Sequence, residues 1–204
     1  MTDADLFAEL AATPDVDARV AEADEDLKRR RAAVKSAEAL LSKVRDEQAG
    51  LSARIARLHE QLGDKTALAN LGSNPDQFPS AARKRSELEN QRATLAQAAD
   101  AHMLLKVLPA NLAVKRAQLD LLMAERAYIF SATLSQLREY EARIRALLEL
   151  DPGVTVAWGE GSFITQSLLA LDARDREIAD ARTKLAEEEV YLSRQQAGIR
   201  QEAA

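Results

Sequence analysis

The chain has 204 residues, of which 33 are acidic and 28 are basic, for a net charge of −5, and it contains no cysteine. The lack of cysteine excludes disulfide frameworks, thiolate metal sites and cysteine nucleophiles. Hydrophobic residues make up 47% of the chain but aromatic residues only 4%, so alanine and leucine supply most of the apolar character. Together with 30% charged residues, this composition is typical of long helices that pack along narrow seams.

The first ten residues are acidic and lack the basic and apolar regions of a signal peptide. The longest apolar stretch, residues 103–114, is interrupted by Lys106 and Pro109 and is shorter than the about 18 residues that a membrane span needs. We therefore expect a protein of the cytoplasm, or of a particle assembled there.

A short helix is predicted for residues 1–12, followed by a helix start at Thr13-Pro14-Asp15. Thr13 is the predicted N-cap, Pro14 fits the first helical position, and Asp15 opposes the positive end of the helix dipole. Leu6, Phe7 and Leu10 lie on one side of the short helix, whose polar face is acidic. An acidic face opposes anionic lipid, so we expect the helix to dock on its own bundle or on a neighbouring subunit rather than on a membrane.

Residues 16–62 carry an unbroken alternation of steps of four and three between apolar positions, which indicates a coiled-coil helix. Only Arg30 and Gln48 are polar among these fourteen seam positions. They are either a tolerated polar layer at an exposed edge or residues that fix the register of pairing. The seam positions are Val16, Val20, Ala23, Leu27, Arg30, Val34, Ala37, Leu41, Val44, Gln48, Leu51, Ile55, Leu58 and Leu62.

Residues 63–80 contain two glycines and two prolines and predict a loop, after which Ser80 would cap a second long helix. This helix extends to Leu150, with Pro109 either kinking it or dividing it in two. A turn centred near residue 71 makes the two long helices antiparallel, with facing residue numbers that sum to about 142. The acidic residues 24–26 would then lie opposite Lys115 and Arg116.

Residues 151–162 predict a turn with a β-like segment at 154–158, and Ser162 would cap the last helix, at residues 163–204. Apolar residues recur every seven positions in that helix, whereas the intervening seam sites are polar (Asp175, Arg182, Glu189 and Gln196). We expect this helix to pack back along residues 113–150. Leu122 and Ile129, in the most apolar stretch, would then be among the most buried residues.

The predicted fold class is all-α: an elongated antiparallel helical hairpin or coiled coil, covering residues 13–150, that is thickened at one end into a three-helix bundle. No motif indicates a reaction. The segment 159–162 lacks the spacing of a phosphate-binding loop, and neither His59 nor His102 has a partner at metal-ligand spacing. We expect no enzyme activity, no catalytic or metal-binding residues, no cofactor and no small-molecule substrate.

Two basic clusters are candidates for phosphate contact, and they keep open an alternative function as a nucleic-acid or membrane-surface binder. Nine acids and one base in residues 1–26, followed by four acids and nine bases in residues 27–62, argue against a continuous nucleic-acid footprint. Solvated or intermolecular salt bridges are the favoured interpretation, which disfavours nucleic acid or a membrane as the partner. The clusters are Lys28, Arg29, Arg30 and Arg31, and Arg83, Lys84 and Arg85.

The pattern favours a non-enzymatic structural protein that self-assembles or docks to a larger complex, such as a virion or another large particle. Its partner would be another protein or a second copy of the chain. A two-helix arm can bury only one seam, so apolar positions at that end of the hairpin are the predicted partner-binding residues. They are Leu51, Ile55, Leu58, Leu62, Leu88 and Leu95.

Overall fold

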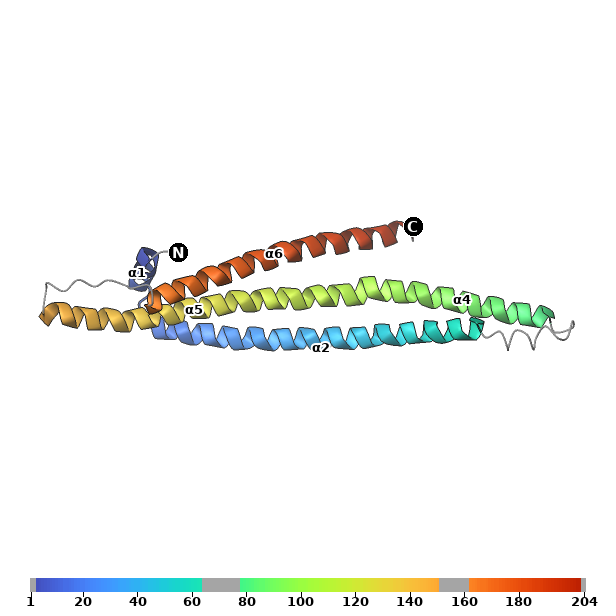
Figure 1. Cartoon of the computed structure of the whole chain (residues 1–204), viewed down its shortest axis with the longest axis horizontal. Coiled ribbons are helices and arrows are strands. Elements are labelled where there is room, and N and C mark those ends of the chain that lie inside the picture. Colours follow the sequence, from blue (N-terminus) through green and yellow to red (C-terminus); the bar gives the residue numbers. More distant parts are fainter. Residues whose placement is uncertain (1–2, 64–77, 151–161, 203–204) are drawn as a thin grey trace. The chain divides into compact units, whose positions relative to one another are not determined.

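The computed structural model describes residues 3–63, 78–150 and 162–202, and nearly all of them are helical (Figure 1). Every element in these ranges is a helix, so the predicted all-α class is confirmed. The β-like segment predicted at 154–158 lies outside the described residues. The helices are α1 (Asp3–Ala12), α2 (Val16–Gly63), α4 (Phe78–His102), the π-helical turn η2 (Met103–Val107), α5 (Leu108–Leu150) and α6 (Phe163–Glu202).

Asp15, and not Thr13, caps the N-terminus of α2. The backbone N–H of Ala18 donates to the Asp15 carboxylate at 2.9 Å. Thr13 instead closes α1, because its backbone N–H donates to the Leu10 carbonyl at 3.2 Å and its hydroxyl to the Glu9 carbonyl at 2.9 Å. The predicted cap is therefore wrong by two residues, since the end of the preceding helix already occupies Thr13.

The other helix ends follow their local signals more closely. The backbone N–H of Thr165 donates to Ser162 Oγ at 3.3 Å, which caps α6, and α2 ends at Gly63. However, α4 begins at Phe78, so Ser80 lies inside the helix and the predicted loop at 63–80 is too long at its C-terminal end. Pro79 permits this early start because the first turn of a helix does not need its missing N–H.

The chain divides into two compact units, the first formed by Met1–Ala37 with Val114–Glu188 and the second by Glu38–Ala113 with Glu189–Ala204. In the first unit, α5 lies between α2 and α6 (Figure 1). Arg30 on α2 pairs with Asp120 on α5 at 3.0 Å, and Glu125 on α5 pairs with Arg174 on α6 at 3.0 Å.

The core of the first unit is where α1 meets the three long helices. Its most buried residues are not Leu122 and Ile129, which are only half-buried. That expectation was wrong because the place where four helices meet lies further along α5 than the predicted helix pairing indicated. The buried cluster consists of Leu6, Leu10, Val16, Leu134, Leu137 and Ile164.

The register of α2 against its antiparallel partner also differs from the prediction. Arg30 faces Asp120 and Asp17 faces Ser135, at 3.0 and 3.3 Å, so facing residue numbers sum to 150 and 152 rather than 142. The acidic residues 24–26 consequently do not face residues 115 and 116. They contact Lys28, Arg29 and Arg30 within α2, whereas Lys115 pairs with Glu188 of α6.

In the second unit, the helix continues past Pro109 without a break. Proline has no backbone N–H and its ring would clash with the carbonyl four residues earlier in an α-helix. Here the Leu108 N–H donates to the Met103 carbonyl, a π-type bond that widens the turn just before the proline. The π-turn therefore accommodates Pro109 within one continuous helix, so the predicted alternative of two separate helices is wrong.

Candidate functional site

The candidate interaction surface is the pair formed by α4 and residues 45–63 of α2, which we call the arm. Arg92 of α4 lies 3.4 Å from Nδ1 of His59 of α2, and their numbers sum to 151. The same register places the predicted partner-binding residues of the two helices opposite one another: Leu62 faces Leu88, and Ile55 faces Leu95. These residues therefore line the seam inside the arm and do not form a separate outer stripe.

That seam is only partly covered. Leu51, Ile55, Leu58, Leu62, Leu88 and Leu95 are all half-buried, and no described residue between 45 and 98 is buried. Two helices can cover only the facing side of each apolar stripe, so the flanks stay in contact with water. Ala93 and Ala98, which flank Leu95, are exposed.

The polar seam position Gln48 has a partner. Its Oε1 lies 2.9 Å from Nδ1 of His102, and Glu47 Oε2 lies 3.2 Å from Nε2 of the same ring. In the first unit the other polar seam position, Arg30, reaches Asp120. In both pairs the two residue numbers sum to 150. The two polar residues in the apolar seam of α2 therefore each face a polar residue, and both pairs have the same register. This arrangement fits the interpretation of Arg30 and Gln48 as register-fixing residues.

The π-turn frees a backbone carbonyl that α6 then satisfies. The carbonyl of Leu104 would accept a hydrogen bond from the N–H of residue 108 in an α-helix, or of residue 109 in a π-helix. The Leu108 N–H donates to the Met103 carbonyl instead, and Pro109 has no N–H. Gln196 Nε2 donates to the Leu104 carbonyl at 3.3 Å. Sequence reasoning missed this contact, although Pro109 and the polar seam residue Gln196 were both identified from the sequence.

The other polar seam sites of α6 act similarly in the first unit. Asp175 forms a bidentate pair with Arg126, and Arg182 contacts the sulfur of Met123 at 3.6 Å. The hydrogen bond from Arg126 lowers the pKa of Asp175, and the same bond raises the pKa of Arg126. The polar sites thus tie α6 to α5 through directed contacts.

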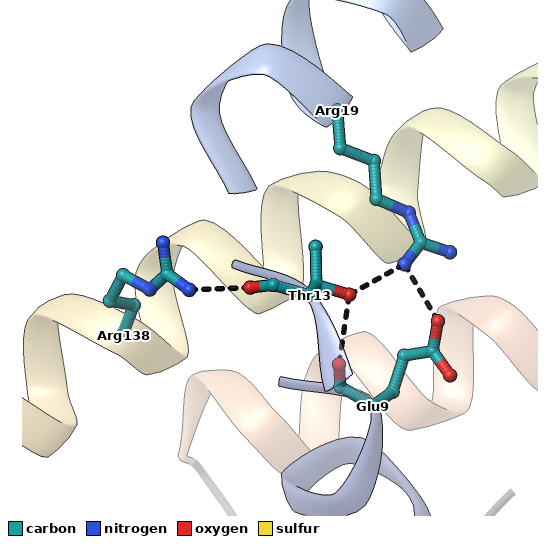
Figure 2. Close-up of polar contacts among 4 residues, drawn as sticks. All are labelled: Glu9, Thr13, Arg19 and Arg138. Carbon is teal, nitrogen blue, oxygen red and sulfur yellow. Dashed lines mark hydrogen bonds and ion pairs between the residues drawn. The ribbon is translucent and has the colours of Figure 1, made fainter. Parts of the chain in front are cut away.

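The junction between α1 and α2 is held by two arginines (Figure 2). Arg138 of α5 donates to the carbonyls of Thr13 and Pro14 at 2.6 and 3.1 Å. Arg19 of α2 donates to Glu9 at 2.7 Å and to the Thr13 hydroxyl at 2.9 Å. Since Leu6 and Leu10 are buried in the same unit, α1 docks on its own bundle.

The first basic cluster is largely neutralised within its own helix. Lys28 contacts Asp24 and Glu25 at 2.8 and 3.0 Å, and the hydrogen bond to Asp24 raises its pKa. Arg29 lies 3.8 Å from Asp26, and Arg31 is exposed. In the second cluster Arg85 pairs with Glu89 at 3.0 Å, while Arg83 and Lys84 are exposed. The two clusters belong to different units.

Among the described residues, no three histidine or carboxylate side chains gather as metal ligands. In the same ranges, none of the helices combines the length and apolarity of a membrane span. Compared with models of protein families, with curated proteins and with solved structures, the chain matches none.

Proposed function

We propose that the chain is a non-enzymatic structural protein that self-assembles, or docks to a larger complex, through the arm. The observation that carries the proposal is the half-buried seam at Leu51, Ile55, Leu58, Leu62, Leu88 and Leu95. Covering even ~400 Å² of apolar surface along its flanks would contribute about 10 kcal/mol before the costs of association. A component of a virion or of another large particle assembled in the cytoplasm is one form of this function.

The first test measures the molecular mass of the protein in solution at several concentrations, by size-exclusion chromatography coupled to light scattering. The double variant A93E/A98E places charge beside the seam at two exposed positions, so it should fold as the parent does but remain monomeric. The matched control is Ala32→Glu, at an exposed position of α2 in the first unit. If the protein docks to a larger complex rather than to itself, that complex is purified with the protein bound. The affinities of the same variants for the purified complex are then compared.

Hydrogen exchange supplies the second readout. We expect residues 51–62 and 82–99 to gain protection in the assembled form relative to the dilute protein. DNA and anionic vesicles are run in parallel, because the alternative function as a phosphate binder predicts salt-dependent binding through Arg31, Arg83 and Lys84. A monomer at all concentrations whose arm is already fully protected, or one that binds DNA or vesicles instead, would contradict the proposal.

A further inference from the structure

A hollow of about 270 Å³ opens between α2 and α5 in the first unit. Three alanines, Ala23, Ala124 and Ala127, form its apolar lining, and Ser131 also lines it. Methyl groups at three positions on facing helices leave a space that longer side chains would fill. The space is therefore a direct result of the local sequence.

Ser131 is the unusual residue of this hollow. It is 2% exposed, yet within the described chain its hydroxyl has no hydrogen-bond partner. Thr133 is equally buried and donates to the Ile129 carbonyl at 2.8 Å. No described polar side-chain atom is both sealed from solvent and unpartnered, so the Ser131 hydroxyl must reach the hollow that it lines. The hydroxyl is therefore the one polar group of a residue that is otherwise covered, and it is open to hydrogen-bond a ligand seated in the hollow.

Two carboxylates and two guanidinium groups line the hollow, and what distinguishes them is how closely each is paired. Glu22 and Asp26 line it, and the carboxylate of Glu22 is in no ion pair within the described chain. In the ion pairs of the described residues, Asp26 lies 3.6 Å from Arg30 and 3.8 Å from Arg29.

Arg19 and Arg30, the guanidinium groups beside them, have closer partners. Arg19 also lines the hollow, but it donates to Glu9 at 2.7 Å and stacks over the Phe130 ring at 5.1 Å. Arg30 pairs with Asp120 at 3.0 Å. Arg29 lines the hollow with a side chain that is 73% exposed, so it can point into solvent. Within the described chain, the charged lining groups without an ion pair closer than 3.6 Å are thus two carboxylates, of Glu22 and Asp26, and the largely exposed guanidinium of Arg29.

We propose that this hollow binds a primary ammonium group carried on a short aliphatic chain. The ammonium donates to the Glu22 and Asp26 carboxylates and to Ser131 Oγ, and the aliphatic part lies on the alanine methyl groups. A free aliphatic diamine and the lysine side chain of a partner protein share this chemistry. The proposal does not depend on the arm, because every lining residue belongs to the first unit.

The probe is 1,4-diaminobutane, titrated into the full chain by calorimetry and by NMR of the alanine methyl groups, with 1-butanol and butyrate as uncharged and anionic controls. We expect saturable shifts at Ala23, Ala124 and Ala127 with the diamine alone. Glu22→Gln should weaken binding about tenfold, and Ala127→Leu should abolish it by filling the hollow. Glu25→Gln is the matched control, since Glu25 contacts Lys28 and does not line the hollow.

Ser131→Ala separates a ligand contact from a structural role. The hydroxyl has no partner within the described chain, so this variant should melt no lower than the parent while its affinity for the diamine falls. A fall in melting temperature with unchanged affinity would assign the hydroxyl to stability and overturn its role in the site.

A capped alanine-rich helical peptide with one lysine distinguishes the source of the ammonium group. Tighter binding of the peptide than of the diamine, lost on acetylation of the lysine, identifies a protein partner. The reverse order identifies a small amine. Binding of neither, or shifts that survive Ala127→Leu, would overturn the proposal.

Discussion

Asp175 and Arg126 illustrate how a polar side chain at a seam position can stabilise two packed helices. The hydrogen bond from Arg126 lowers the pKa of Asp175, so the folded state favours the charged carboxylate. The contribution is fully present above the ordinary aspartate pKa of about 3.9 and is lost as the pH falls through the lowered value.

Asp175→Asn should therefore lower the melting temperature at pH 7, and the difference from the parent should disappear as the solution is acidified below about pH 4. Thermal unfolding at a series of pH values measures this. Asp180→Asn is the control, because its pair with Lys184 lies within one helix and is largely exposed. A difference that persists unchanged at low pH would show that the pair does not act through charge.

Asp15 shows why the sequence placed a helix start correctly only to within two residues. Thr13 and Asp15 are both good capping residues, and their order along the chain does not say which one the preceding helix uses. Only the contact of Thr13 with the last turn of α1 decides between them.

Asp15→Ala should destabilise the chain by about 1 kcal/mol, or about 2–4 °C in melting temperature for a protein of this length. Glu38→Ala, at an exposed position of the same helix, should have little effect. A loss of stability of this size in Thr13→Ala, with none in Asp15→Ala, would show that Thr13 and not Asp15 caps α2.

At the level of elements, α1 is a small helix that completes a core. Leu6 is fully buried, whereas Phe7 beside it is 38% exposed. Leu6→Ala should therefore cost about 2–5 kcal/mol, and Phe7→Ala should cost much less. Thermal unfolding, with hydrogen exchange of residues 3–12, measures both. Equal and small effects would mean that α1 adds little to the core.

The sequence predicted the helices well because their signals are local. Seam spacing, Gly63 and Ser162 each act within a turn or two, and these features match the observed α2 and α6. The pairing register was not predictable in the same way. It depends on which residues face each other, as Arg30 faces Asp120 and Gln48 faces His102, and the midpoint of a loop does not determine this. For the same reason, Leu122 and Ile129 were chosen as the most buried residues of the apolar stretch 119–137, whereas the deepest core lies at its end, at Leu134 and Leu137.

For the candidate site, the sequence identified the apolar residues of the arm but not their environment. Spacing alone cannot say whether a position such as Ile55 faces the inside or the outside of the arm, because a single apolar stripe can serve an internal seam or a partner. The polar contacts at the π-turn needed three separate segments, around Gln48, Leu104 and Gln196, to be brought together.

At the level of the whole molecule, burial differs between the two units. Residues at 0% exposure, such as Val16 and Leu171, belong to the first unit, whereas the best-buried described residues of the second, Ala99 and Leu112, are 6% exposed. Opening of a segment becomes easier as its buried apolar contacts decrease. In the dilute protein, amides of residues 45–63 should therefore exchange faster than those of residues 16–37 of the same helix. Mass-spectrometric hydrogen exchange tests this, and uniform rates along α2 would contradict it.

The π-turn at Met103–Val107 has a consequence for which changes in chain length the protein can tolerate. A π-turn contains one residue more than an α-helical turn, so removing one residue there restores ordinary spacing and leaves the seams on either side in phase. Deleting Lys106, which is exposed, together with Pro109→Ala, so that no proline ring needs the wider turn, should preserve helix content and cooperative melting. Deleting the exposed Gln118 from α5 would rotate all following residues by about 100° about the helix axis and unfold the seam. A length difference of one residue between variants of this chain is therefore expected first at residues 103–107.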